Sequence, residues 1–246
     1  MNPPLAVVSG GTRGIGLALS RRLVKLGHRV VALYRADADA AAAAVAELGP
    51  MLTAMPTDVG DPAAVVAVGG RVLAEHGVPR VLVNNAGRNL DRPFLEMSVD
   101  EWRQVLDTNL NGPFYLTRML APAMLTEPGA VIVNIGATTG IRPRRDGANY
   151  CASKAGLLQL TKCLALELAP RIRVNCLIPG MTGTDELTAR YRLEDPTARA
   201  AVLAEIPQAR IGSTDDVADG LEFLVGPGSA YLTGQKLIVD GGQFMW

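Results

Sequence analysis

Short apolar runs alternate with longer, more polar or alanine-rich stretches along the whole chain. The runs are rich in Val, Ile and Leu and lack a polar face, which is typical of strands buried on both sides of a parallel sheet. Seven strands are predicted, at residues 5–8, 29–34, 51–55, 80–83, 131–135, 171–178 and 236–239. Strands alternating with helices predict an α/β fold: a single Rossmann-type doubly wound parallel sheet with helices on both faces.

Local signals place the helices between these strands. A helix that follows Gly16 is predicted to stop at Gly27, because glycine readily adopts the left-handed conformation that ends helices. Asp61-Pro62 and the pair Ser213/Asp216 are typical helix starts. Further helices are predicted from the alanine-rich run at 40–44 and from 150–168.

Two segments have weaker patterns. A long helix is predicted over 99–125, with an irregularity near Asn109 and Gly112-Pro113, because Asn and Pro are both unfavourable inside helices. Residues from about 185 to 209 are polar, helical in composition and poorly patterned. They suit a mobile substrate lid between two better-formed elements.

Composition narrows the class of protein. The chain has 246 residues, 48% hydrophobic and 20% charged, and no linker-like stretch divides it, so one domain over 1–246 is expected. Lys+Arg and Asp+Glu are both 24, which argues against nucleic acid as a partner. The start, Met1 to Pro4, lacks a basic segment, and no apolar run approaches membrane-spanning length. Three cysteines without metal-ligand spacing predict no metal site and a cytoplasmic location.

A glycine-rich turn follows the first strand. The segment Ser9 to Gly16 stands between a predicted strand and a predicted helix, the context in which backbone N–H groups bind a dinucleotide pyrophosphate. Its spacing is Gly-x-x-x-Gly-x-Gly rather than Gly-x-Gly-x-x-Gly, so a merely tight strand-to-helix turn is the alternative reading.

The end of the second strand bears on the choice of cofactor. An acidic residue at this distance from the glycine turn would bind the ribose hydroxyls of NAD, but Tyr34 and Arg35 stand there. Arg35 and Arg13 are suited to hold the 2′-phosphate of NADP(H) by charge-assisted hydrogen bonds. Two solvated arginines are the alternative, and Asp37 keeps NAD open.

Tyr150 and Lys154 lie four residues apart on a predicted helix, so both side chains are expected on one face. An ammonium beside a phenol stabilises the phenolate and so lowers the pKa of the phenol. A tyrosine adjusted in this way can exchange a proton near neutral pH. Without a cofactor site, the same pair would read as a surface tyrosine and a solvated lysine.

These motifs together resemble the short-chain dehydrogenase/reductase family over essentially the whole chain, and most closely its 3-oxoacyl-(acyl carrier protein) reductases. The resemblance rests on order and spacing of Ser9 to Gly16, Asn84 to Gly87, Asn109, Tyr150 with Lys154, Pro179-Gly180 and Tyr231 to Gln235.

The resemblance implies an NADPH-dependent ketoreductase and a set of site residues. Around the cofactor it implies Gly10, Thr12, Arg13, Gly14, Ile15 and Gly16 at the pyrophosphate, Arg35, Asp58 and Val59 at the adenosine, Asn85, Ala86 and Gly87 at its ribose, Lys154 and Tyr150 at the nicotinamide ribose, and Pro179, Gly180, Thr182 and Thr184 at the carboxamide. For catalysis it implies Tyr150 as general acid, with Asn109 holding a water that relays protons towards Lys154.

One position departs from the family's pattern. The family places a serine thirteen residues before the tyrosine, and here that residue is Ala137. Thr138 is a substitute only if the chain turns there, since neighbouring strand residues face opposite ways. Ala137 therefore favours one alternative to an NADP(H)-dependent ketoreductase, a catalytically weak or silent NADP(H)-binding scaffold or sensor. An NAD-linked alcohol dehydrogenase is the other alternative.

Partners are predicted from the remaining features. The substrate is expected to be a small-molecule or carrier-bound ketone. The arginines Arg142, Arg144 and Arg145 are suited to an acidic carrier protein, a phosphopantetheine phosphate or a substrate carboxylate, or they form a solvated loop. The apolar tail 244–246 and the resemblance imply a homotetramer.

Overall fold

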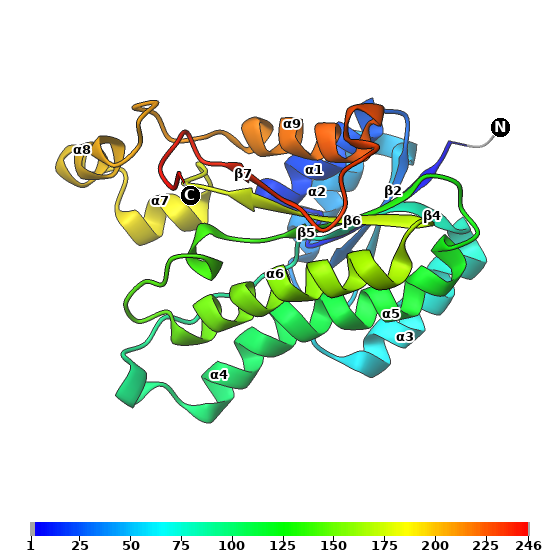
Figure 1. Cartoon of the computed structure of the whole chain (residues 1–246), viewed down its shortest axis with the longest axis horizontal. Coiled ribbons are helices and arrows are strands. Elements are labelled where there is room, and N and C mark those ends of the chain that lie inside the picture. The colour runs from blue at the N-terminus through cyan, green and yellow to red at the C-terminus, as the bar shows by residue number, and fades with distance from the viewer. Residues whose placement is uncertain (1–2, 246) are drawn as a thin grey trace.

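The computed structural model describes residues 3–245 and contains one seven-stranded sheet in which every strand pair is parallel (Figure 1). The strand order is β3-β2-β1-β4-β5-β6-β7. The strands are β1 Leu5–Ser9, β2 Arg29–Tyr34, β3 Leu52–Pro56, β4 Pro79–Asn84, β5 Ala130–Ile135, β6 Ile172–Pro179 and β7 Lys236–Val239. The predicted α/β fold with a single doubly wound sheet is confirmed.

Helices cover both faces of this sheet (Figure 1). One face is covered by α1 Gly14–Lys25, α2 Ala38–Leu48 and α9 Thr214–Val225. The other is covered by α3 Pro62–Arg71, α5 Gly112–Met124 and α6 Ala148–Leu168, and α4 Val99–Leu106 packs against α6. The remaining two α-helices, α7 Asp185–Tyr191 and α8 Pro196–Ala204, lie beyond one end of the strands (Figure 1).

Two hydrophobic cores explain why the strands read as unbroken apolar runs. In β1, Val7 belongs to one core together with Leu120 of α5, and Val8 belongs to the other together with Leu19 of α1. Successive side chains of a strand point to opposite faces. A strand covered by helices on both faces therefore has apolar residues at most positions.

The irregularity predicted inside residues 99–125 is confirmed. A π-helical turn, Asp107–Asn111, separates α4 from α5. Pro113 follows it at the start of α5, where its missing N–H breaks the regular ladder of hydrogen bonds. The wider π turn places Asn109 inside the molecule, fully buried. Such single-turn π segments are frequent at functional sites.

Residues 185–209 form two short helices, as their polar, helical composition predicts. Arg192 has a left-handed φ of 50° and ends α7. Neither α7 nor α8 contains a buried residue, whereas Leu193 and Ile206 beside them are buried. A few apolar anchors thus hold a segment that is otherwise half-buried or exposed, and its motion as a lid stays a prediction.

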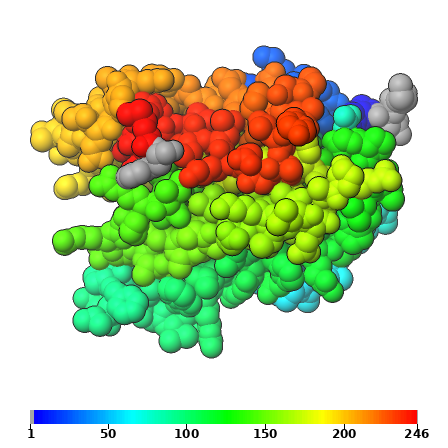
Figure 2. Space-filling model, in the orientation of Figure 1, coloured from blue at the N-terminus to red at the C-terminus, as the bar shows by residue number. Residues whose placement is uncertain are grey.

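One edge of the sheet collects the segments that the sequence singles out. The strand order reverses beside β1, which pairs with both β2 and β4, and ligands of open α/β sheets bind beyond the carboxyl ends of the strands at such a point. The loops after β1, β4, β5 and β6 start there. The loop after β5 and helices α7 and α8 form the same end of the molecule (Figure 2). Among residues 3–245, no helix is long and apolar enough to cross a membrane.

Candidate active site

The glycine loop joins β1 to the N-terminus of α1 in a conformation that requires glycine. Gly10 and Gly14 have positive φ angles of 64° and 52°. A Cβ on Gly16 would lie 1.9 Å from the carbonyl oxygen of Gly10, so no side chain fits there. Helix α1 begins with no side-chain cap and no acidic residue in its first turn. Its free N–H groups therefore remain available to an anion.

Ser9 and Asn85 hold this loop against the end of β4. The Ser9 hydroxyl accepts hydrogen bonds from the backbone N–H groups of Asn85 and Ala86, both at 3.0 Å. The Asn85 amide donates to the carbonyls of Ser9 and Gly10, at 2.9 and 3.1 Å. The sequence indicated Asn85 and Ala86 but not the role of Ser9. Their contact with a ribose, and that of Gly87, stays a prediction.

The candidate phosphate-binding arginines are Arg13 in the glycine loop and Arg35 directly after β2. Arg13 forms an ion pair with Asp37 at 3.7 Å, and the two side chains are 77% and 46% exposed. Asp37 also caps α2 by accepting from the Ala40 N–H. An ion pair this exposed contributes little, so an incoming phosphate can compete with it. Arg35 is exposed at the same edge.

The predicted adenine-binding pair has local structural roles. Asp58 is exposed, and its carboxylate accepts from the N–H of Gly60 at 2.9 Å. Val59 is buried in the core and lies against Gly112, where an added Cβ would be 3.0 Å from it. Val59 thus packs under the π turn, and its contact with a base is still to be tested.

Asn109 links the loop after β4 to helix α6. Its amide oxygen accepts from the Arg88 N–H at 2.7 Å, and its amide nitrogen donates to the Arg88 carbonyl at 2.9 Å and to the Ser153 hydroxyl at 3.1 Å. Ser153 in turn donates to the Tyr150 carbonyl at 2.8 Å. The side chain is therefore engaged in positioning the helix that bears Tyr150. Its predicted role in a water relay stays a prediction.

Tyr150 and Lys154 meet as their spacing predicts. The Lys154 ammonium lies 5.8 Å from the centroid of the Tyr150 ring and donates to the Ile135 carbonyl at 2.7 Å. Lys154 is buried, with 3% of its surface exposed. The last residue of β5 thus anchors the lysine directly beside the tyrosine.

The expected lowering of the Tyr150 pKa is wrong for this structure. Burial, assisted by the negative charge of Glu186, raises the pKa of Tyr150 to about 12. Burial also lowers the pKa of Lys154 to about 8. The charged form of each group loses hydration on burial, which raises the pKa of an acid and lowers that of a base. A phenol of raised pKa stays protonated at neutral pH and is ready to donate.

Ala137 occupies the position at the end of β5 where the family places a serine. Its backbone is extended, and the next residue opens a 3₁₀ turn, Thr138–Gly140. A Cβ on Gly140 would lie 2.8 Å from the backbone of Lys154, so this turn packs directly on α6. Because the chain turns at Thr138, the alternation rule does not exclude its hydroxyl as a substitute. Thr138 is buried, with 9% of its surface exposed.

The segment after β6 crosses above the glycine loop. Gly180 packs on Asp240, to which an added Cβ would approach within 2.4 Å, and an added Cβ on Gly14 would lie 3.7 Å from the Thr184 methyl group. Thr184 caps α7 by accepting from the Leu187 N–H, and Thr182 is buried and donates to the Gly180 carbonyl. The end of this segment at Thr184 therefore lies beside the glycine loop at Gly14.

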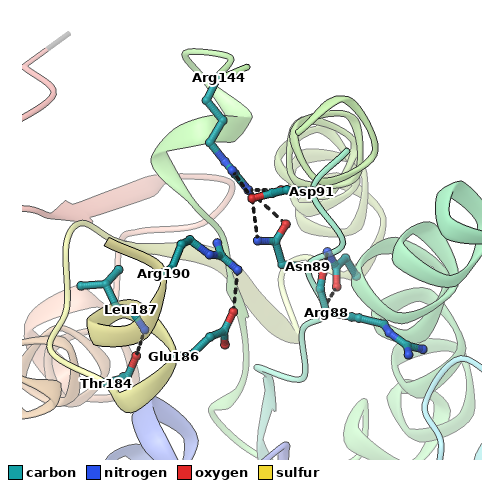
Figure 3. Close-up of polar contacts among 9 residues, drawn as sticks. Arg88, Asn89, Asp91, Arg144, Thr184, Glu186, Leu187 and Arg190 are labelled. Carbon is teal, nitrogen blue, oxygen red and sulfur yellow. Dashed lines mark hydrogen bonds and ion pairs between the residues drawn. The ribbon is translucent and has the colours of Figure 1, made fainter. Parts of the chain in front are cut away.

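The three loop arginines do not act as one patch. Arg144 turns inward and binds Asp91 with both terminal nitrogens, one of them at 2.7 Å, and the Asn89 side chain at 3.0 Å (Figure 3). Arg142 and Arg145 are exposed. On α7, Arg190 pairs with Glu186 at 2.8 Å (Figure 3). The sequence offered no signal for the Arg144–Asp91 pair, whose partners are 53 residues apart.

A glycine loop at the start of a helix, a tyrosine beside a buried lysine, and a parallel sheet define a class that the comparisons identify. The family model described as "Enoyl-(Acyl carrier protein) reductase" matches residues 10–243. The chain belongs to the short-chain dehydrogenase/reductase family of oxidoreductases. Among residues 3–245, no group of three or more His, Cys, Asp or Glu is placed to hold a metal ion.

Its relatives include enzymes named 3-oxoacyl-[acyl-carrier-protein] reductase FabG. The chain is 36% identical to that of Escherichia coli (strain K12) over 243 residues, which cover 98% of this chain and 97% of the relative. It is 36% identical to that of Staphylococcus aureus (strain Mu50), covering 98% of each chain. The Vibrio cholerae protein is 35% identical, covering 98% of this chain and 97% of the relative.

Proposed function

We propose that this chain reduces the ketone of a 3-oxoacyl thioester, or of a related biosynthetic ketone, to a secondary alcohol with NADPH. A hydride adds to the carbonyl carbon, and the proton of the Tyr150 hydroxyl passes to the carbonyl oxygen. The observation that carries the proposal is the half-buried Tyr150 beside the buried Lys154 at the end of β5. The names of the relatives support the substrate class.

The residues present fit a nicotinamide dinucleotide. Gly10, Gly14 and Gly16 leave a backbone cradle that a Cβ would fill, and the uncapped N-terminus of α1 favours the pyrophosphate. When bound, the cofactor supplies the hydride, while the protein supplies orientation and electrostatics. Arg13 and Arg35 are proposed to select NADP(H), the first by leaving Asp37 for the 2′-phosphate.

Side chains of the protein then carry out the proton transfer to the carbonyl oxygen. Tyr150 is protonated at neutral pH, because burial raises its pKa to about 12, so it serves as general acid. The Lys154 ammonium, whose pKa burial lowers to about 8, is poised to return a proton to the tyrosinate. Asn109 and Ser153 hold the first turn of α6 in place. Ala137 leaves the carbonyl oxygen without the hydroxyl donor that a serine would supply, and the hydroxyl of the neighbouring Thr138 is the alternative donor.

Ala137 supports a second candidate, a catalytically silent NADP(H)-binding scaffold or sensor. A turnover screen separates the two. We expect NADPH oxidation with 3-oxoacyl groups on a carrier protein or on coenzyme A, and less with free 3-oxo acids. A protein that binds NADPH but turns over none of these substrates would favour the silent candidate.

Tyr150→Phe tests the assignment of the acid. The ring still packs but has no proton to give, so turnover should fall about 10²–10⁴-fold while NADPH binding is retained. Tyr231→Phe is the matched control, since Tyr231 is fully exposed. Retention of more than about a tenth of wild-type turnover in the Tyr150 variant would contradict the role of general acid.

A further inference from the structure

A cation other than Lys154 also lies against the Tyr150 ring. The guanidinium carbon of Arg144 is 5.5 Å from the ring centroid, slightly closer than the Lys154 ammonium at 5.8 Å. A guanidinium at this distance from an aromatic ring is attracted by the ring quadrupole. Arg144 is only 22% exposed, so this attraction acts partly out of water.

The position of Arg144 is determined by two side chains from another loop. Both terminal nitrogens bind the Asp91 carboxylate, and one also binds the Asn89 amide oxygen at 3.0 Å. Such a bidentate pair fixes direction as well as distance. The loop after β4 thereby holds a side chain from the loop after β5 (Figure 3). This places the guanidinium over the ring of Tyr150 on α6.

Charged groups surround Tyr150 from every neighbouring element. They are Arg144 after β5, Lys154 on α6, Asp91 after β4, and Glu186 with Arg190 on α7. Arg144 and Arg190 lower the pKa of Tyr150, while Glu186 and Asp91 raise it. Arg144 is the cation that lies against the ring and is anchored outside α6 and α7.

We propose that Arg144 is a positioning residue for Tyr150: clamped by Asp91 and Asn89, it fixes the ring and keeps a positive charge beside the group that exchanges the proton. The inference rests on the proposed function, since it assigns Tyr150 the proton transfer. The charge favours the tyrosinate that forms when the proton leaves. The clamp keeps this charge in one place, whatever the position of α7.

The test uses the reverse reaction, oxidation of 3-hydroxybutyryl-CoA by NADP⁺, in which the tyrosinate accepts a proton and the rate rises with pH. Removing the positive charge makes the tyrosinate harder to form. Arg144→Gln should therefore move the midpoint of the kcat–pH profile upward by about half a pH unit or more. Arg144→Lys should restore most of this shift, because it keeps the charge.

Asp91→Asn distinguishes an electrostatic role from a structural one. Both Asp91→Asn and Arg144→Gln break the same ion pair, but the first removes a negative charge from the surroundings of Tyr150. We therefore expect the midpoint of the kcat–pH profile of Asp91→Asn to stay unchanged or to move downward, whereas that of Arg144→Gln moves upward. Arg118→Gln, which removes an exposed arginine of α5, should leave the profile unchanged.

Two results would overturn the inference. One is an unchanged midpoint in Arg144→Gln; the other is equal loss of kcat in Arg144→Gln and Asp91→Asn without any shift, which is what a loop brace alone would give. If Arg144→Gln does not fold, the direction of the Asp91→Asn shift decides. Wild-type turnover in Tyr150→Phe would instead reject the proposed function, and with it this inference, so the two failures are distinguishable.

Discussion

Replacing Lys154 with Met should remove a stability cost that the active site imposes on the fold. Burial lowers the pKa of Lys154 from its ordinary value of 10.5 to about 8. At pH 7 the folded chain holds this charge at a cost of about 3 kcal/mol, since one pH unit corresponds to about 1.4 kcal/mol. Lys154→Met also removes the hydrogen bond to the Ile135 carbonyl. This loss destabilises the variant by about 1–3 kcal/mol.

The dependence on pH is a sharper prediction than the net value at one pH. The folded-state pKa is the lower one, so between pH 8 and 10.5 the unfolded chain binds more protons and the wild type gains stability as pH rises. Met cannot titrate. From pH 7 to pH 9, the wild type should therefore gain about 1 kcal/mol relative to Lys154→Met.

The assay is urea unfolding of both proteins without cofactor, at pH 7 and pH 9 and at one protein concentration. Lys162→Met is the control, because Lys162 is exposed on the same helix and its charge stays in water in both states. Its difference from wild type should be the same at both pH values. A Lys154→Met difference that also stays constant would refute the reasoning, because it would mean that the buried ammonium is not desolvated.

Three further predictions follow from the site and the surface. Ala137→Ser should raise turnover, recovering part of the roughly 10²–10³-fold that one oxyanion donor typically contributes. If the Thr138 hydroxyl already contacts the carbonyl oxygen, Ala137→Ser changes turnover little and Thr138→Ala lowers it. Steady-state rates of both variants decide between these outcomes. Arg35→Ala should weaken NADPH binding by about 1.5–3 kcal/mol while sparing NADH, as measured by fluorescence titration; equal affinities in the wild type would contradict the preference. The protein should sediment as a homotetramer, and Leu166→Glu should weaken assembly because Leu166 is 83% exposed on α6; a wild-type monomer at micromolar concentration would disprove it.

The apolar tail used to predict assembly is only partly visible. Trp246 lies outside the described residues, 3–245, so the part of the prediction that depends on it is not addressed by the structure. Met245 is 79% exposed. An apolar side chain at this exposure is consistent with a surface that a second subunit covers.

Local features of the fold could be predicted because their causes lie within a few residues. The apolar runs marked all seven strands, since burial favours apolar residues at most strand positions, although the edge strands β3 and β7 are partly exposed. The helix start at Ser213 and Asp216 was predicted from its capping box and is confirmed. The spacing of Tyr150 and Lys154 was enough to place both side chains together, because one helical turn joins them.

The electrostatics of the site depended on tertiary structure. Asn109 binds Arg88 and Ser153, which are 21 and 44 residues away, and the clamp of Arg144 by Asp91 spans 53. No local period or cap encodes such contacts, because they arise only when parallel strands bring their loops to one edge of the sheet. The pKa of Tyr150 was predicted in the wrong direction for the same reason: burial, which the packed fold decides, outweighs the charge one helical turn away.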